Sequence, residues 1–419
     1  MKQLLDAPSP SPSPPGRRAL PIKWIVVTAV AVLVIAAVGA GLVLRSAGNG
    51  SAAAGILAGG GKKGAAAQPP APPVRLAISP SNKAAKVRLD AKVKVRVTSG
   101  TIRSVKVTGD GKTVPGKADA SGETWTSTAA LAPGTRYKLS VVAVDAAGQA
   151  TTKTSTFSTL TPARELETSV MPLDGETVGV GMPIAVFFNE PVKDRAAVER
   201  KLEVTSIHDV NGAWHWRNDE EVRWRPEKYW PAGEKVNLKV NLAGVNAGNG
   251  TWGVKGRSIS FKIGDAHIST VNVNAHKMVV TSNGKTVKTF PSSTGRDKYP
   301  TTNGIHTVLG MERSRIMDSA TVDGIPSSEA YRLKVEYATR ISNTGEFVHA
   351  APWSVGSQGS ANVSHGCVNL STGNAAWFYQ FSRRGDIVKV VGSPRKPGDT
   401  EGLVEWNQSW ASWKKGSAL

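Results

Sequence analysis

The residues best suited to covalent chemistry are a single cysteine and a histidine that precedes it. Cys367 is the one cysteine in 419 residues, and His349 lies eighteen residues upstream, at the end of an apolar, β-branched run. A thiol becomes a useful nucleophile only as a thiolate, and a nearby histidine can accept its proton or hold it as an imidazolium–thiolate pair. The spacing and residue types therefore predict a cysteine–histidine pair for nucleophilic catalysis.

The segment around the cysteine is typical of a tight turn. It reads Ser364-His365-Gly366-Cys367, and Gly366 permits backbone geometry that other residues resist. We expect the backbone N–H groups of Gly366 and Cys367 to point at one spot and stabilise an oxyanion, with Ser364 and His365 shaping the site. His365 is the alternative base, but two residues before a nucleophile its side chain is expected to face away. A lone cysteine is usually a small buried hydrophobe, yet these polar neighbours are poor core composition.

This segment resembles the signature of the L,D-transpeptidases, the YkuD-type enzymes that cross-link peptidoglycan. The resemblance rests on His349, the eighteen-residue step and the run 364–369, and it extends through 351–354, 374–379 and 384–388. In detail the chain is most similar to the multidomain, mycobacterial-type members. The resemblance is strong over residues 160–415 and rests on architecture alone before them.

The resemblance implies acyl transfer through a thioester. Cys367 would attack a peptide carbonyl, and His349 would take the thiol proton and later protonate the leaving amine. The implied donor is a peptidoglycan tetrapeptide stem, cleaved between its third residue and the terminal D-alanine. The implied acceptor is a side-chain amine of another stem, so the product is a direct cross-link between third residues. Carbapenem β-lactams are implied inhibitors because they acylate the same family.

The resemblance also implies roles for residues outside the pair. Tyr331 resembles the lid tyrosine that lines the substrate path, and Thr344-Gly345 resembles the turn that presents backbone groups to substrate. Asn369 carries an amide suited to binding substrate, with a turn-stabilising role as the alternative. Relatives often have Ser directly after the catalytic histidine, where this chain has Ala350. A triad through that hydroxyl is therefore impossible here, but a backbone carbonyl could orient the imidazole.

No cofactor or catalytic metal is expected, because the other histidines lack metal-ligand spacing with a thiol or carboxylate. They are His208, His215, His267, His276 and His306. The net charge of +20 suggests an anionic partner. No stretch pairs a basic helix with aromatic residues as a nucleic-acid reader would, so nucleic acid is not an expected partner.

The N-terminal region predicts a membrane anchor. Residues 1–23 form a proline-rich tail, and the 21 residues 24–44 carry no charge. As a helix these would span about 32 Å, enough for a bilayer. Arg17, Arg18 and Lys23 precede them, which favours an internal N-terminus and an extracytoplasmic catalytic domain facing the cell wall. A cleaved signal peptide is the alternative. Residues 45–73 are typical of a flexible Gly/Ala/Pro linker.

The rest of the chain is predicted to be mainly β. Residues 74–160 and 161–263 show short alternating strands typical of immunoglobulin-like sandwiches, with Tyr137 as a candidate corner tyrosine. The tryptophans concentrated in the second segment are interpreted as core and interface residues, with glycan contact as the alternative. They are Trp214, Trp216, Trp224, Trp230 and Trp252.

Residues 264–392 are predicted to form the catalytic domain. Residues 268–290 indicate a β meander that 304–309 continues, and 311–328 suit a mobile loop over the site. One helix is expected from Ser371 or Thr372 through Ser382, and its N-terminus would lower the thiol pKa. The extension 393–419 carries Trp406, Trp410 and Trp413, so we expect it to pack on the catalytic domain or on the second β domain.

Two further functions stay open. A sortase-like transpeptidase needs an arginine on a strand near the site, whereas Arg383 and Arg384 fall at the end of the predicted helix. A non-catalytic wall-binding protein need not keep an intact Cys367–His349 pair. Papain-like and NlpC-type peptidases place the cysteine before the histidine, so the chain order argues against them.

Overall fold

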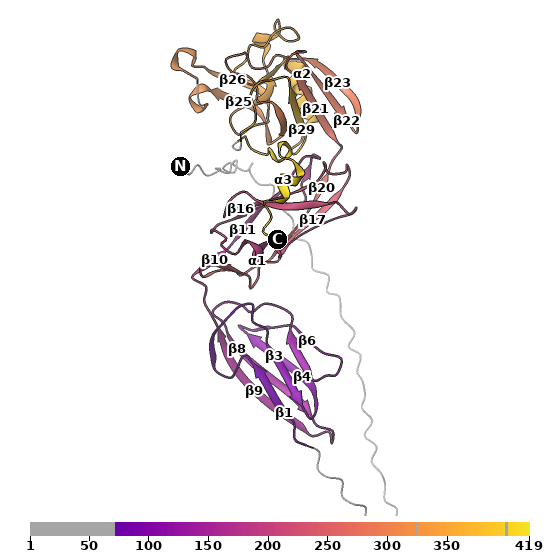
Figure 1. Cartoon of the computed structure of the whole chain (residues 1–419), viewed down its shortest axis with the longest axis vertical. Coiled ribbons are helices and arrows are strands. Elements are labelled where there is room, and N and C mark those ends of the chain that lie inside the picture. Colours follow the sequence, from indigo (N-terminus) through magenta and orange to yellow (C-terminus); the bar gives the residue numbers. More distant parts are fainter. Residues whose placement is uncertain (1–71, 323–324, 399–400) are drawn as a thin grey trace, which may run out of the picture. The chain divides into compact units, whose positions relative to one another are not determined.

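The computed structural model describes residues 72–322, 325–398 and 401–419, and strands dominate these ranges (Figure 1). The proline-rich tail, the apolar segment 24–44 and the linker up to residue 71 lie outside the described residues. Within the described ranges, no helix is long and apolar enough to cross a membrane.

The first β region is a sandwich of two sheets. Its strands are β1 (Arg75–Ser79), β2 (Ala84–Val87), β3 (Lys94–Thr98), β4 (Thr101–Gly109), β5 (Lys112–Thr113), β6 (Gly116–Ala118), β7 (Thr124–Ser127), β8 (Arg136–Val144) and β9 (Ala150–Thr159). The sheets have the orders β1-β3-β7-β6 and β2-β9-β8-β4-β5. Side chains from both sheets, such as Val95 and Leu139, share one buried cluster. The hydroxyl of Tyr137 accepts a hydrogen bond from the Ala132 backbone N–H at 2.7 Å, as expected of a corner tyrosine.

The second β region surrounds a larger core. Its elements are β10 (Arg164–Leu166), β11 (Thr168–Met171), β12 (Thr177–Val178), β13 (Ile184–Phe188), α1 (Arg195–Glu199), β14 (Leu202–Ser206), β15 (Gly212–Trp216), β16 (Glu221–Pro226), β17 (Lys235–Val240), β18 (Asn246–Gly248), β19 (Thr251–Gly253) and β20 (Arg257–Ile263). The main sheets have the orders β11-β13-β16-β15 and β12-β20-β17-β14. The tryptophans singled out in this region are all buried. The interpretation as core residues is therefore confirmed.

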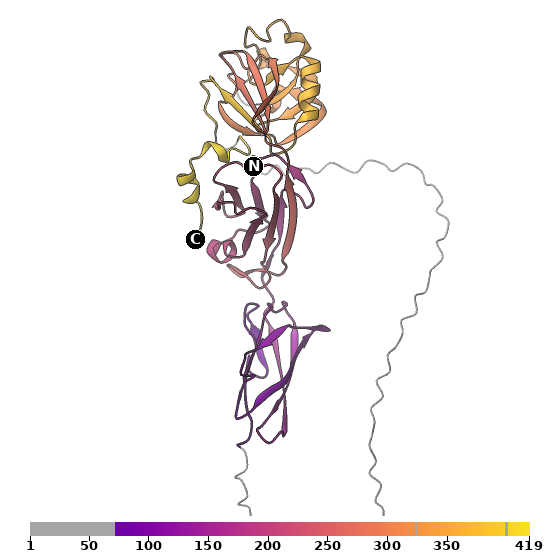
Figure 2. The ribbon, with the colours of Figure 1, turned by 90° about the vertical axis from the view of Figure 1, so that its right-hand side faces the viewer.

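The region predicted to be catalytic is built on two sheets and one α-helix. Its elements are β21 (His267–Asn272), β22 (Lys277–Ser282), β23 (Lys285–Pro291), β24 (Gly304–Thr307), β25 (Gly310–Asp318), β26 (Arg332–Arg340), β27 (Phe347–Ala350), β28 (Val368–Leu370), α2 (Thr372–Phe381) and β29 (Ile387–Val391). The sheets have the orders β23-β22-β21-β29-β24 and β25-β26-β27-β28. Ala375 and Phe378 of α2 are buried in one cluster with residues of both sheets, and Figure 2 shows α2 along the catalytic domain.

Several local predictions for this region are confirmed and two are wrong. The meander appears as β21, β22 and β23, and α2 begins after Ser371, whose side chain accepts from the Asn374 N–H. However, β24 lies beside β29 rather than beside the meander's last strand. The expected loop 311–328 also begins as strand β25, which pairs with β26 from Gly310↔Arg340 to Asp318↔Arg332. Backbone hydrogen bonds to β26 hold β25, which is partly exposed on both faces. Its sequence therefore lacks the apolar alternation that predicts a strand.

The C-terminal extension packs on the second β region. It contains the 3-10 turn η4 (Glu405–Asn407) and helix α3 (Trp410–Lys414). Trp413 is fully buried, donates from Nε1 to the Ala213 carbonyl at 2.9 Å and stacks on His215. Arg225 lies over the rings of all three tryptophans of the extension. The tryptophans of the extension thus pack on the second β domain, while Asn407 bonds to Ile305 of β24, so the extension contacts both of the partners that the sequence allowed.

Replacing Trp413 should destabilise the second β region. Trp413→Ala would leave a cavity and remove the hydrogen-bond donor of the Ala213 carbonyl. We expect this to lower the free energy of unfolding by about 3–5 kcal/mol. Urea unfolding of the full chain followed by tryptophan fluorescence would measure the loss. Ile207→Ala is the matched control, because Ile207 is 66% exposed and should change little. Equal unfolding midpoints for the two variants would contradict the packing described.

Candidate active site

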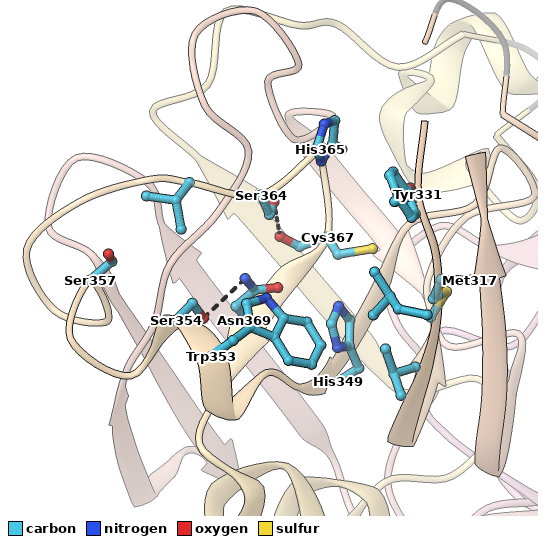
Figure 3. Close-up of a pocket in the computed structure, with 13 residues that line it drawn as sticks. Met317, Tyr331, His349, Trp353, Ser354, Ser357, Ser364, His365, Cys367 and Asn369 are labelled. Atoms are coloured by element: carbon cyan, nitrogen blue, oxygen red, sulfur yellow. Dashed lines mark hydrogen bonds between the residues drawn. The ribbon is translucent and has the colours of Figure 1, made fainter. Parts of the chain in front are cut away.

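Most of the residues singled out for chemistry line one cavity of about 330 Å³ (Figure 3); Thr344, Gly345 and Gly366 are not part of the lining. Its lining is Met317, Tyr331, Leu333, Val335, His349, Trp353, Ser354, Ser357, Val363, Ser364, His365, Cys367 and Asn369. Among the described residues, no group of three or more His, Cys, Asp or Glu side chains is placed to hold a metal ion.

Strand pairing brings the cysteine and the histidine together. His349 lies on β27, and Cys367 directly precedes β28. The two strands pair in parallel, with His349 opposite Asn369. Both side chains therefore enter the same cavity (Figure 3), although eighteen residues separate them in the sequence.

The thiol of Cys367 is held neutral. It donates to the carbonyl oxygen of Gly345 at 3.7 Å. Burial raises the pKa of the Cys367 thiol to about 12, and the charge of Glu346 acts in the same direction, whereas the Phe347 backbone lowers it. The net shift is upward, opposite to the lowering expected from a helix N-terminus. Strand β28 separates Cys367 from the start of α2 at Thr372, and desolvation dominates.

His349 is also neutral, and its tautomer is fixed. The residue is 4% exposed, and its Nδ1 lies 2.9 Å from the carbonyl oxygen of Ala350. A carbonyl can only accept, so Nδ1 carries the proton and Nε2 keeps its lone pair. Burial lowers the pKa of His349 to about 4. The prediction that a backbone carbonyl orients the imidazole is confirmed, and Ala350 supplies that carbonyl itself.

The turn before the cysteine differs in part from the prediction. Gly366 has φ +120°, a conformation that needs glycine. Its N–H donates to Ser364 Oγ at 3.0 Å, and that hydroxyl donates to the Cys367 carbonyl at 2.6 Å. The expectation that the Gly366 N–H faces an oxyanion is therefore wrong, because Ser364 occupies this donor. The backbone N–H of Cys367 stays the candidate donor on this turn.

His365 lines the cavity, but its Nε2 contacts Arg296, so it is not placed to act as the base. Its Nε2 lies 2.9 Å from Nη2 of Arg296, a group that can only donate. The ring also lies against those of Tyr299 and Tyr331, in tilted contacts with centroids 4.9 and 5.0 Å away. Burial and the charge of Arg296 lower the pKa of His365. The expectation that His365 faces away is therefore met only in part: the ring lines the cavity, but its Nε2 accepts from Arg296.

The remaining predicted residues meet the cavity in different ways. Tyr331 lines it, and burial raises the pKa of its hydroxyl to about 12. Asn369 donates from Nδ2 to Ser354 Oγ at 3.2 Å, and its buried Oδ1 has no partner within the described ranges. Thr344 turns its hydroxyl to Glu401 at 2.5 Å, so of the Thr344-Gly345 turn it is the Gly345 carbonyl that contacts the thiol.

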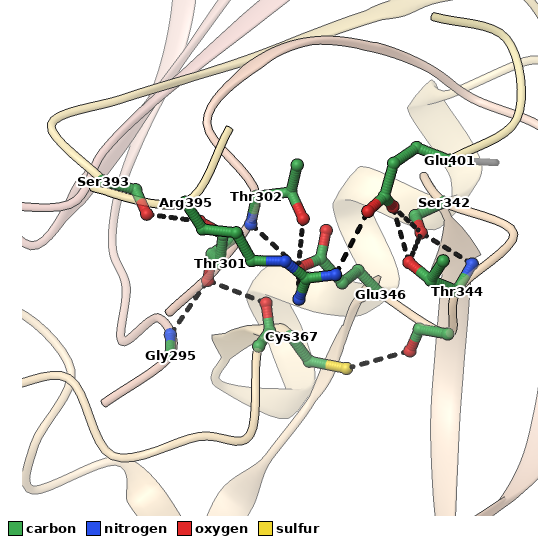
Figure 4. Close-up of polar contacts among 12 residues, drawn as sticks. Gly295, Thr301, Thr302, Ser342, Thr344, Glu346, Cys367, Ser393, Arg395 and Glu401 are labelled. Atoms are coloured by element: carbon green, nitrogen blue, oxygen red, sulfur yellow. Dashed lines mark hydrogen bonds and ion pairs between the residues drawn. The ribbon is translucent and has the colours of Figure 1, made fainter. Parts of the chain in front are cut away.

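Sequence reasoning missed the charged residues behind the cysteine. Glu346 is 4% exposed and Glu401 is also 4% exposed, with Arg395 between them (Figure 4). The available signal was a carboxylate next to the apolar run Phe347–Val348, where a buried position is expected. Their partners come from distant segments, which spacing alone does not reveal.

Comparisons with known proteins agree with this architecture. Residues 266–390 match the model of the L,D-transpeptidase catalytic domain, YkuD, and residues 84–246 match that of the bacterial Ig domain, Big_10. The chain is 43% identical to L,D-transpeptidase 2 of Mycobacterium tuberculosis over 82% of this chain and 85% of that relative. It is 35% identical to L,D-transpeptidase 5 of the same species, over 83% of this chain and 78% of that relative.

A solved structure of an LD transpeptidase in complex with imipenem shares 40% sequence identity with the chain. It has a TM-score of 0.48, and the alignment covers 55% of this chain and all (100%) of that one. The extent of the identity to L,D-transpeptidase 2, over most of both sequences, is the decisive comparison. This chain belongs to the L,D-transpeptidase family.

Proposed function

We propose that this L,D-transpeptidase cross-links peptidoglycan through a thioester formed on Cys367. One observation carries the proposal: Cys367 and His349 enter one cavity, and the hydrogen bond to Ala350 leaves Nε2 of His349 free to accept a proton. A thiol and an unprotonated imidazole in one cavity are suited to acyl transfer.

The proposed first half-reaction forms the acyl-enzyme. Sγ of Cys367 bonds to the carbonyl carbon of the donor's third residue, and the thiol proton moves to Nε2 of His349. The C–N bond to the terminal D-alanine then breaks, and that proton passes to the leaving amine. Because burial keeps both groups neutral before attack, proton transfer accompanies the attack rather than preceding it.

The proposed second half-reaction restores the thiol. The side-chain amine of another stem attacks the thioester carbonyl, and His349 takes a proton from that amine. The C–S bond breaks, and His349 returns the proton to Sγ. The product is a cross-link between third residues, with D-alanine as the released product. Water in place of the amine would give hydrolysis instead.

The other cavity groups are proposed to hold the donor. The N–H of Cys367 would donate to the developing oxyanion, on a turn braced by Ser364, Gly366 and His365. The unpaired Oδ1 of Asn369 suits a backbone N–H of the stem. Two further groups contribute to binding. Tyr331 would cover the path, and the Thr344-Gly345 turn would present its backbone.

The location of the reaction is also a proposal. The uncharged run 24–44, preceded by Arg17, Arg18 and Lys23, supports a single-pass anchor with the N-terminus inside. The catalytic domain would then lie outside the cytoplasm, where peptidoglycan is found. Alkaline phosphatase fused after residue 419 should be active if this orientation holds, and inactive if it is reversed.

Acylation by a carbapenem tests the nucleophile directly. The strained β-lactam carbonyl should acylate Cys367 of the full chain and add the mass of the drug in intact-protein mass spectrometry. Cys367→Ala should show no adduct. An adduct retained in Cys367→Ala, or none in the unmodified chain, would contradict the proposal, and the second result would favour a non-catalytic wall-binding protein.

Replacing the proposed base should slow acylation without abolishing the fold. His349→Gln removes the proton acceptor and should reduce the acylation rate about 10²–10⁴-fold. Stopped-flow fluorescence with excess carbapenem would give the rate. His365→Gln is the matched control, because His365 already accepts from Arg296, and its loss should cost far less. Equal losses for the two variants would argue against His349 as the base.

Introducing the family's usual serine should have little effect. In Ala350→Ser the backbone carbonyl that holds Nδ1 of His349 is unchanged, so the acylation rate should stay within about threefold. The same stopped-flow assay measures it. A gain of an order of magnitude would show that the backbone contact orients the imidazole poorly.

A further inference from the structure

Glu346 lies between the two backbone groups that contact the nucleophile. The carbonyl of Gly345 on one side accepts from the Cys367 thiol, and the backbone of Phe347 on the other lowers the pKa of that thiol. Phe347 also begins β27, the strand that carries His349. Contacts that hold Glu346 in place therefore also position the two backbone groups beside the thiol and the start of β27, which carries His349.

The side chain of Glu346 is held behind the cysteine turn. Its Oε1 accepts from the N–H of Thr302 at 2.8 Å and from its hydroxyl at 3.0 Å, and Nη1 of Arg395 lies 3.4 Å away (Figure 4). A Cβ added to Gly366 would lie 3.3 Å from Oε1, so the carboxylate abuts the backbone next to Cys367. Its Oε2 is buried and unpartnered among the described residues.

Arg395 joins this carboxylate to a second one. Its Nη2 donates to Oε1 of Glu401 at 3.1 Å. The other oxygen of Glu401 accepts from the hydroxyls of Ser342 at 2.7 Å and Thr344 at 2.5 Å. Glu401 of the C-terminal extension therefore holds the turn 342–345, whose Gly345 carbonyl accepts from the thiol, and Arg395 joins Glu401 to Glu346 (Figure 4).

We propose that Arg395 and Glu346 form a charge pair behind the nucleophile, through which the C-terminal extension controls how readily Cys367 ionises. The inference rests on the proposed function only in taking Cys367 as the nucleophile. A negative Glu346 opposes formation of a thiolate, and the guanidinium offsets that charge. Both are positioning residues, because their side chains are absent from the lining of the substrate cavity.

The surroundings of the pair set the sign of its pH response. Burial raises the pKa of Glu346 to about 7, Glu401 raises it further and Arg395 lowers it. The other titratable groups facing the pair or its target are Glu401, His306, His349, Tyr331 and Cys367. Below about pH 7 the carboxyl is neutral and the thiol ionises more readily. Above it the carboxylate suppresses ionisation.

The pH dependence of Cys367 alkylation tests the proposal. Iodoacetamide reacts with the thiolate, so the logarithm of its rate with the full chain should rise in proportion to pH, with a break near pH 7. Above the break, the alkylation rate should be about tenfold lower than the rates below pH 7 extrapolate to, because the carboxylate of Glu346 has become charged. Mass spectrometry follows the reaction, with Cys367→Ala as the blank.

Three variants assign the break. Glu346→Gln keeps an oxygen for Thr302 and should remove the break. Arg395→Gln should move it to higher pH, because the carboxylate loses its counter-charge, whereas Arg395→Lys is the control that keeps it near its original position. An unbroken profile in the unmodified chain, or a break retained in Glu346→Gln, would overturn the proposal. An unbroken profile alongside a normal carbapenem adduct would overturn this inference alone and leave the transpeptidase proposal standing.

Discussion

The chemistry of this chain depends on keeping a thiol and an imidazole uncharged inside one cavity. Burial disfavours the charged form of each group, so it raises the pKa of Cys367 and lowers that of His349. An imidazolium–thiolate pair is therefore not the resting state. Proton transfer has to accompany bond formation. The cavity has to stabilise the negative charge that develops on the substrate carbonyl oxygen during attack.

The backbone fixes this arrangement more than any side chain does. The parallel pairing of β27 and β28 sets His349 against Asn369, the Ala350 carbonyl selects the tautomer, and the Gly345 carbonyl holds the thiol. The C-terminal extension supports the backbone from behind. Its tryptophans pack on the second β region, Glu401 accepts hydrogen bonds from the turn beside the thiol, and Arg395 pairs with Glu346, so one segment links a neighbouring domain to the site.

Sequence patterns predicted the features that depend on neighbouring residues in the chain. The β meander, helix α2 with its Ser371 cap and the pairing of Cys367 with a histidine all follow from periodicity, capping and residue type. Spacing could not show that the Gly366 N–H is taken by Ser364, or that desolvation outweighs the helix N-terminus. The carboxylates and Arg395 were missed because most of their contacts join segments separated by 44 residues or more, and the Arg395–Glu401 contact spans a turn without a sequence signature.

Direct titration of the thiol tests this account most closely. Thiolate absorbs in the ultraviolet, and the difference between the full chain and Cys367→Ser isolates the signal of Cys367 over a pH series. We expect no detectable thiolate at neutral pH, and its appearance only well above the ordinary thiol pKa of about 8.5. A thiolate already formed at neutral pH, accompanied by a protonated His349, would contradict the neutral pair on which the proposed mechanism is built.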